Sequence, residues 1–418
     1  SGEVVVEGGV ITNGSLLPAV VTPSVNGSEI NPYGSDVPYY SQLVYDTAND
    51  KLVVVWQDNT TVAGKAVVGT ISGDSISFGT TVTWDSNINS FGAVYDSNSG
   101  KIVIAFQDAG DSQKGKTLVG TVSGTDISFG SENTFLTQRS ERVTCVFDSS
   151  VNKVLIVFRN QDNSNYGTAI AGTVSGTSMT FGSSVVFSSY NSDNFKGDFD
   201  SSQNTSIVAF STIGGGNVCA RFNISSGSVI SSYGNKGFFT GDVSSSDVGD
   251  IGVAYDTTAN RSVITFSDAN NSNYGTCVVA NFSGGGVPTF GSEVVFNAAT
   301  TSRNVIGNDP VNGLTLIAYQ DGGDSSKGKF LTAIVDGTSL TYGSAVTFDT
   351  ATTITWSLLK DPDGGKFILS YMNYPNTYLR TITMTSGFPN LAIGSTYYVQ
   401  DDGTLSTTSS SVTAGKAI

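Results

Sequence analysis

A polar loop that recurs four times carries the residues best suited to hold a metal ion. Its copies read "DAGDSQKG" (108–115), "NQDNSNYG" (160–167), "DANNSNYG" (268–275) and "DGGDSSKG" (321–328). Counted back from the final Gly, an Asp or Asn stands seven and four residues earlier, and a Ser stands three residues earlier. Calcium binds carboxylate oxygens in Gly-containing loops, so its candidate ligands are Asp108, Asp111, Asp321 and Asp324.

The number of oxygens in each loop argues against calcium. The ion takes about six to eight oxygen ligands, and each loop offers two or three side chains. Asp, Asn and Ser side chains also accept hydrogen bonds from the backbone of their own turn, and that role alone explains the pattern. We therefore expect these loops to be turns that bind no cofactor or metal, with calcium binding as the alternative.

The sequence lacks the residue sets of common catalytic sites. It contains no His, which excludes Ser-His-Asp triads, Cys-His pairs and His-bound metals. Glycosidases need two facing carboxylates. Glu occurs only six times, and only Glu141, in "QRSERVTCVFD", stands among other charged residues. Nearly all Asp residues recur with the repeat described below, which is typical of turn residues, so we predict that the protein is not an enzyme.

Residues that depart from the repeat are better candidates for ligand binding. Four arginines do so, namely Arg139, Arg142, Arg159 and Arg303. Of these, Arg139 and Arg159 are our ligand-binding candidates. Tyr166 and Tyr274 both belong to the word "NSNYG" and can present aromatic faces on loops, as carbohydrate sites do. The alternative for each Tyr is aromatic packing at the rim of the fold.

One sequence pattern repeats about every 52 residues. Successive copies read "GTISGDSISFGTTVTW" (69–84), "GTVSGTDISFGSENTF" (120–135) and "GTVSGTSMTFGSSVVF" (172–187). An Asp near the end of an apolar run keeps the same period and occurs at Asp46, Asp96, Asp148, Asp200, Asp256, Asp309 and Asp361. Self-similarity at a fixed period indicates a repeat architecture.

Each repeat contains four strand-like runs separated by turn residues. In the second repeat these runs are 90–96, 101–108, 116–124 and 127–135. Four antiparallel strands with a period near 50 residues are typical of a propeller blade. The sequence therefore predicts an all-β protein, a seven-bladed β-propeller of four-stranded blades. In the aromatic-Gly pair of each repeat, we expect the ring to pack between blades and the Gly to let neighbouring backbone approach closely.

Three segments are expected along the chain. Residues 1–36 form an N-terminal arm, residues 37–386 form the propeller, and residues 387–418 form a short C-terminal β segment outside the repeat. The fourth strand of the last blade is either "LAIGSTYYV" (391–399) or part of the N-terminal arm. We favour the arm, because shared closure ties the two chain ends together and leaves no bare sheet edge.

Composition disfavours two classes of partner. The formal net charge of −15 disfavours binding to nucleic-acid phosphates. No apolar run reaches the length needed to span a bilayer, so membrane insertion is not expected. The three cysteines, Cys145, Cys219 and Cys277, lie in strand-like runs, which predicts small buried residues rather than a reactive site.

The last 25 residues follow no repeat and contain three short words in a fixed order. These are "YYV" (397–399), "DGTLST" (402–407) and "AGKAI" (414–418). The order resembles a C-terminal segment of tail-fibre and other virion-appendage proteins of bacteriophages. The words "NSNYGTA" and "FGSEVVF" are similar to repeats in structural proteins of marine phages. The resemblance implies a non-enzymatic virion component on the extracellular face of the particle.

Receptor engagement is the role that this resemblance implies. The expected partners are other virion proteins and a glycan or protein receptor on the host surface, and the expected fibre assembly is a homotrimer. One alternative is a secreted or cell-surface bacterial propeller that binds glycans. Another is a tail-spike-type hydrolase or lyase that degrades polysaccharide.

Overall fold

Antiparallel β-strands make up nearly all of the structure. The computed structural model describes residues 23–213, 216–239, 251–282, 287–362, 366–373 and 376–383, and the strands at 396–399, 405–406 and 412–416. Two short 3-10 turns, η1 (Ala269–Asn271) and η2 (Gly322–Asp324), are the helical elements of this described part. None of its helices has the length and apolarity needed to cross a membrane. The predicted all-β class is confirmed.

Most strands fall into successive sets, here called units 1 to 7, in which neighbours along the chain pair with each other. Unit 1 contains β2 (Pro38–Asp46), β3 (Lys51–Asp58), β4 (Gly64–Ser72) and β5 (Ser75–Phe78). Unit 2 contains β7 (Ile88–Asp96), β8 (Lys101–Asp108), β9 (Lys114–Ser123) and β10 (Asp126–Phe129). Unit 3 contains β11 (Asn133–Asp148), β12 (Lys153–Asn160), β13 (Tyr166–Ser175) and β14 (Ser178–Phe181).

The remaining units follow the same order. Unit 4 contains β15 (Val185–Asp200), β16 (Thr205–Thr212), β17 (Gly216–Ile224) and β18 (Ile230–Phe239). Unit 5 contains β19 (Ile251–Asp256), β20 (Arg261–Asp268), β21 (Tyr274–Asn281) and β22 (Thr289–Phe290). Unit 6 contains β23 (Val294–Asp309), β24 (Leu314–Asp321), β25 (Lys327–Asp336) and β26 (Ser339–Tyr342). Unit 7 contains β27 (Val346–Lys360), β28 (Lys366–Asn373), β29 (Asn376–Thr383) and, from the N-terminal segment, β1 (Ser24–Ile30).

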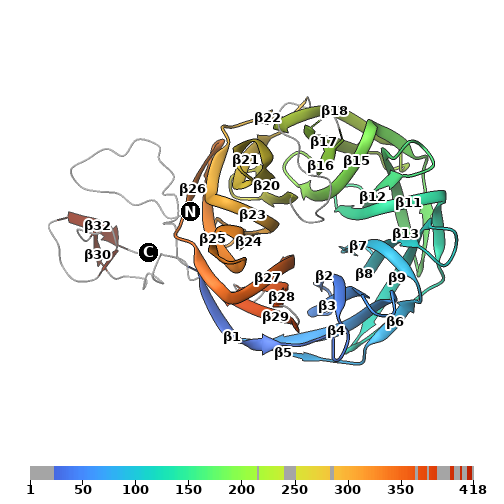
Figure 1. Ribbon diagram of the computed structural model, residues 1–418, viewed down its shortest axis with the longest axis horizontal. Coiled ribbons are helices and arrows are strands. Elements are labelled where there is room, and N and C mark those ends of the chain that lie inside the picture. Colours follow the sequence, from blue (N-terminus) through green and yellow to red (C-terminus); the bar gives the residue numbers. More distant parts are fainter. Residues whose placement is uncertain are drawn as a thin grey trace.

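Long strands join neighbouring units. The first half of β11 pairs with β9 of unit 2, and its second half pairs with β12 of its own unit. β15, β23 and β27 are shared between units in the same way, and β6 (Val82–Asp85) makes the corresponding pairing with β4. Figure 1 shows the units arranged around a ring. The first strand of each unit, here called the inner strand, contacts the next one along, and β2 contacts both β7 and β27.

The apolar core lies between units, on both faces of the second strand of each unit. In β3, Val53 and Val55 pack against β8 of unit 2. The alternate residues Leu52, Val54 and Trp56 pack against β28 of unit 7. Because successive side chains of a strand point to opposite faces, a strand covered on both sides must be apolar throughout, which explains the continuous run "LVVVW".

The Gly of the aromatic-Gly pair lies against the hairpin turn of the next unit. A Cβ atom on Gly79 would lie 2.0 Å from the carbonyl oxygen of Thr125, and one on Gly130 would lie 2.2 Å from that of Thr177. The predicted close approach of neighbouring backbone is confirmed at these positions. The hairpin glycine Gly176 has a φ of +63°, which supplies the turn conformation that its position requires.

The periodic Asp residues are confirmed as turn residues. Each is buried, and the Oδ1 atoms of six accept a hydrogen bond from the backbone amide two residues later: Asp46, Asp96, Asp148, Asp200, Asp256 and Asp309. This contact turns the chain from the inner strand into the second strand.

Unit 7 draws its outer strand from the N-terminal segment. β1 pairs antiparallel with β29, so strands from both ends of the repeat region share one sheet. The buried Tyr33 follows β1, and its Oη lies 2.8 Å from Ser41 Oγ of unit 1 and 2.9 Å from Ser370 Oγ of unit 7. Of the other segment considered for this position, residues 391–395 lie outside the described residues. β30 (Thr396–Val399) pairs instead with β31 (Leu405–Ser406) and β32 (Val412–Lys416).

Candidate functional site

Lysine side chains ion-pair with the carboxylates proposed as calcium ligands in unit 2. Lys116 Nζ lies 2.5 Å from Asp108 Oδ2, 3.1 Å from Asp111 Oδ2 and 2.8 Å from Glu132 Oε2. Lys114 Nζ lies 2.8 Å from Asp111 Oδ1. The ammonium group of Lys116 therefore occupies the position in which a calcium ion would contact the oxygens of Asp108 and Asp111.

Unit 6 has the same arrangement. Lys329 Nζ lies 2.7 Å from Asp321 Oδ2 and 2.9 Å from Asp324 Oδ2. Lys327 Nζ makes a second ion pair with Asp324, at 2.8 Å. The Oδ1 atom of Asp321 also accepts the backbone amide of Gly323. The two candidate loops thus combine lysine pairing with turn capping.

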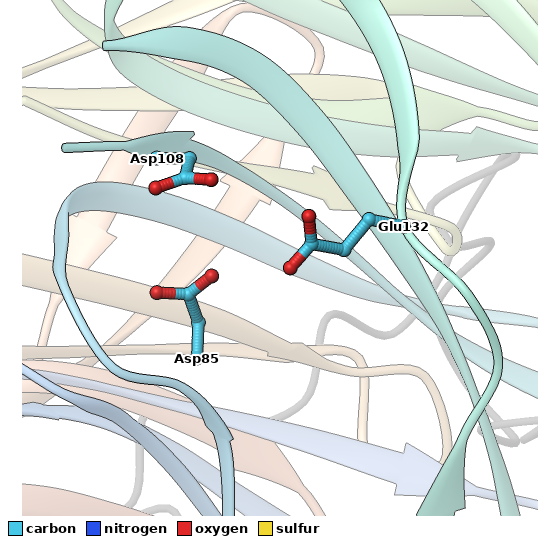
Figure 2. A group of neighbouring side chains, drawn as sticks. All are labelled: Asp85, Asp108 and Glu132. Atoms are coloured by element: carbon cyan, nitrogen blue, oxygen red, sulfur yellow. The ribbon is translucent and has the colours of Figure 1, made fainter. Parts of the chain in front are cut away.

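Three carboxylates of unit 2 and its neighbour form the cluster drawn in Figure 2. Carboxylate oxygens of Asp85, Asp108 and Glu132 lie within 4.8 Å of one another. Burial, together with the negative charges of Asp108 and Glu132, raises the pKa of Asp85 to about 6. Because Lys116 already pairs with two of the three groups, the cluster is an ion-pair network. Asp85 was not among the sequence candidates, since its contact with Asp108 depends on the pairing of units.

The four ligand-binding candidates from the sequence do not form one site. Arg139 is half exposed and pairs with Asp162, with 2.7 Å between Nε and Oδ1. Tyr166 begins β13 of unit 3, whereas Tyr274 begins β21 of unit 5. Arg159 alone joins the charged network next to the pocket described below.

Six of the inner strands, all except β19, show a shift in strand register where they pair with the second strand of their unit. In units 3, 4 and 6 the residue at this shift has a positive φ: 54° at Arg142, 55° at Asn194 and 58° at Arg303. Such a bulge redirects a side chain out of the regular alternation of the strand. Residues with a side chain avoid this conformation unless their surroundings hold it, so these positions are candidates for function.

A pocket of about 70 Å³ lies among the inner strands of units 1 to 4. Its wall is built from the starts of β2 and β7 and the middle parts of β11 and β15, together with Gln57 near the end of β3. The lining residues are Tyr39, Tyr40, Gln57, Asn89, Ser90, Phe91, Arg142, Val143, Thr144, Asn194, Phe195 and Lys196. Corresponding positions of four repeats therefore supply chemically different side chains to one hollow.

A charged network supports one side of this pocket. The buried carboxylate of Asp193 lies 3.0 Å from Arg142 Nε and 3.2 Å from Arg159 Nη1, and it accepts the backbone amide of Asn194 at 2.8 Å. Arg159 also pairs with Glu141. Burial alone would raise the pKa of Glu141, but the hydrogen bond and charge of Arg159 outweigh it and hold that pKa below its usual range.

This arrangement is suited to binding. The charged groups that line the pocket, Arg142 and Lys196, are both cations. The nearby carboxylates of Asp193 and Glu141 form ion pairs with arginines. Neither is therefore a general acid that faces a second unpaired carboxylate, which is the arrangement that glycoside hydrolysis needs. Cys145, Cys219 and Cys277 are buried, as predicted, and burial raises the pKa of each thiol above its usual range.

Sequence reasoning missed the residues on which the pocket most depends. Lys196 stands four residues before a periodic Asp, where unit 2 has Gly92 and unit 5 has Gly252. A lysine at a repeat position that is uncharged in the other six copies is a signal that the sequence did contain. Asn194 carries no comparable signal, because its backbone conformation is visible only in the structure.

Comparison with known proteins identifies the fold alone. No protein-family model and no curated protein matches the sequence. The structure is similar to the crystal structure of Sqt1 from Chaetomium thermophilum, with a TM-score of 0.53 and 8% identity over 87% of this chain and 100% of that chain. It is also similar to the crystal structure of a protein from Lactobacillus plantarum, with a TM-score of 0.52 and 12% identity over 75% of this chain and 86% of that one. These likenesses show a β-propeller-like fold.

Proposed function

We propose that the protein is a non-enzymatic binding component of a bacteriophage virion, a tail fibre or similar appendage, and that its pocket engages the host cell surface. The observation that carries the binding role is the pocket itself. Four units built from one repeat supply it with different aromatic, amide and cationic side chains. Structural repetition requires none of these differences, so they fit a role in recognition.

We further propose that the units form a closed, seven-bladed β-propeller. The contacts of β2 with both β7 and β27 support this proposal, as does the pairing of β1 with β29. Closure in this way leaves no exposed sheet edge between the first and last blades. It also brings inner strands distant in sequence around one axis, which is where the pocket lies.

The virion assignment is supported by the C-terminal segment, whose order of "YYV", "DGTLST" and "AGKAI" resembles that of phage appendage proteins. The proposal places the protein on the extracellular face of the particle, in contact with other virion proteins and as a homotrimer if it belongs to a fibre. Its host partner is a surface glycan or protein. Nucleic acid and membrane are not proposed as partners.

A binding experiment with host cells tests this proposal. The purified protein is incubated with candidate host cells and with their extracted surface glycans, and both bound protein and released saccharide are measured. We expect binding without release and weaker binding by Lys196→Met. Lys153→Met, at the start of β12 in unit 3, should bind as the wild type does. Release of oligosaccharide would favour the hydrolase or lyase alternative. Binding to glycans without binding to any candidate host cell would favour the secreted glycan-binding propeller.

A further inference from the structure

We infer that the pocket recognises a sugar residue bearing a carboxylate, which rests on the proposed binding function and specifies its ligand. The charge of the lining is the first reason. The protein carries 35 Asp and Glu against 20 Lys and Arg, yet the pocket is lined by Arg142 and Lys196 and by no carboxylate. A local excess of positive charge in a strongly acidic chain matches an anionic group of small size.

Arg142 has donor groups free for such an anion. Among the described residues its guanidinium pairs with Asp193 through Nε, at 3.0 Å, and makes no hydrogen bond through either Nη atom. The planar guanidinium can donate two parallel hydrogen bonds to a carboxylate. The ion pair with Asp193 holds the guanidinium beside the pocket, and the bulge at Arg142 directs its side chain there.

Lys196 supplies the uncompensated charge. Arg142 and Arg159 are balanced by Asp193 and Glu141. The ammonium of Lys196, in contrast, has no carboxylate within ion-pair distance in the described part of the chain. Its contacts there are with Tyr40, at 3.4 Å from the hydroxyl oxygen and 5.4 Å from the ring centroid. A ligand carboxylate would provide the missing counter-charge.

The remaining lining fits the neutral part of a sugar. Asn194 is 5% exposed, and its Oδ1 has no hydrogen-bond partner in the described residues, so a ligand hydroxyl that donates to it would satisfy a buried acceptor. Tyr39 is 60% exposed beside the pocket, and its ring offers an aromatic face for the C–H side of a sugar ring. A volume of about 70 Å³ accommodates the carboxylate and one edge of the ring, which fits a terminal sugar residue.

The test compares two sugars that differ at one carbon. Binding of D-glucuronate and of D-glucose is measured by titration calorimetry and by saturation-transfer NMR, with the wild type, Lys196→Met, Lys196→Arg, Arg142→Gln and Lys153→Met. We expect glucuronate to bind at least tenfold more tightly than glucose, Lys196→Met to remove that preference, and Lys196→Arg to retain part of it. Lys153→Met is the control, since its ammonium contacts Thr173 away from the pocket. Circular dichroism checks that each variant folds, because Arg142→Gln leaves Asp193 with one arginine.

The outcomes separate this inference from the proposed function. Equal binding of both sugars, unchanged in Lys196→Met, would overturn the carboxylate inference and leave a neutral-glycan pocket. Binding of neither sugar would also overturn it, and the host-cell experiment would then decide the proposed function independently. A preference for glucuronate that persists in Lys196→Met and Arg142→Gln would place the acid site elsewhere and overturn the assignment to this pocket.

Discussion

Lys196 of β15 lies over the ring of Tyr40 of β2, although the two strands belong to units 4 and 1. The ammonium nitrogen is 5.4 Å from the ring centroid and 3.4 Å from the hydroxyl oxygen. Two whole units separate these residues along the chain. The contact therefore shows that side chains of inner strands that are not sequence neighbours converge at the pocket.

A double-mutant cycle measures the strength of this contact. We expect Lys196→Met and Tyr40→Leu to show a coupling of about 0.5–1 kcal/mol in the free energy of unfolding, as cation–π pairs at partly exposed sites do. The measurement is urea denaturation of the wild type, the two single variants and the double variant. Raising the salt concentration should reduce the coupling, because the ammonium is partly open to solvent. Strict additivity would show that the two side chains do not interact in solution.

The close approach of Gly79 to the Thr125 carbonyl predicts that this position does not tolerate a side chain. A Cβ atom would lie 2.0 Å from a backbone oxygen, so Gly79→Ala must displace the hairpin turn of the next unit. We expect a loss of about 1–3 kcal/mol in unfolding free energy, the usual cost of overpacking, measured by urea denaturation. Gly227→Ala is the matched control, because the nearest atom to its Cβ is a side-chain oxygen at 3.8 Å. A Gly79→Ala variant as stable as Gly227→Ala would contradict this packing between units.

Much of the fold could be predicted because it depends on local rules applied repeatedly. The Asp at the end of six inner strands caps its own turn, and the Gly of four aromatic-Gly pairs lies against the backbone of the next unit. Such features recur along the chain and are visible in the sequence. The all-β class and the turn positions follow from them directly.

The pocket could not be predicted in the same way, because it depends on which units meet. Arg142 pairs with Asp193, 51 positions later in the chain, and Lys196 meets Tyr40. Neither pairing has a sequence spacing that distinguishes it from other charged residues. Tyr166 and Tyr274 share the word "NSNYG" in the sequence, yet they lie in units 3 and 5 and do not form one site. Residues that are alike in all repeats thus determine the fold, whereas the pocket is lined by residues that differ between repeats.

The raised pKa of Asp85 predicts that stability depends on pH. Its pKa of about 6 exceeds the value of about 3.9 expected for an unfolded chain. Between these values the folded protein binds more protons than the unfolded chain, so the free energy of unfolding falls as the pH rises. Asp85→Asn removes this loss, and we expect it to stabilise the protein by about 1 kcal/mol above pH 6, allowing for solvent screening.

The variant and the wild type are compared by thermal denaturation at pH 4, below the pKa of Asp85 in the folded protein, and at pH 8, above that pKa. The gain should be present at pH 8 and small at pH 4, where Asp85 of the folded wild type is already protonated. Asp126→Asn serves as the control, because Asp126 is exposed. An Asp85→Asn variant that gains equally at both pH values would show that charge on Asp85 is not the cause.

The ion pairs of Lys116 predict how the acidic loops respond to calcium. Because its ammonium contacts Asp108, Asp111 and Glu132, we expect millimolar calcium or a chelator to leave the melting temperature of the wild type unchanged. Lys116→Met leaves Asp108 and Glu132 without their cation, while Asp111 keeps Lys114, and we expect a cost of about 1–3 kcal/mol. Calcium should restore part of that loss in the variant. Differential scanning fluorimetry with and without calcium measures both effects, and a calcium-dependent rise in the wild type would instead support a native calcium site.

The hydroxyl of Tyr33 predicts a cost for weakening the junction between units 1 and 7. It bridges the buried hydroxyls of Ser41 and Ser370, so Tyr33→Phe leaves two buried polar groups short of a partner while it keeps the ring against Trp56. We expect a loss of about 1–3 kcal/mol in unfolding free energy, measured by urea denaturation. Tyr190→Phe should be neutral, since that side chain is 55% exposed. If the two variants were equally stable, the junction would depend on the pairing of β1 with β29 and on apolar packing, and the hydroxyl bridge would contribute nothing measurable.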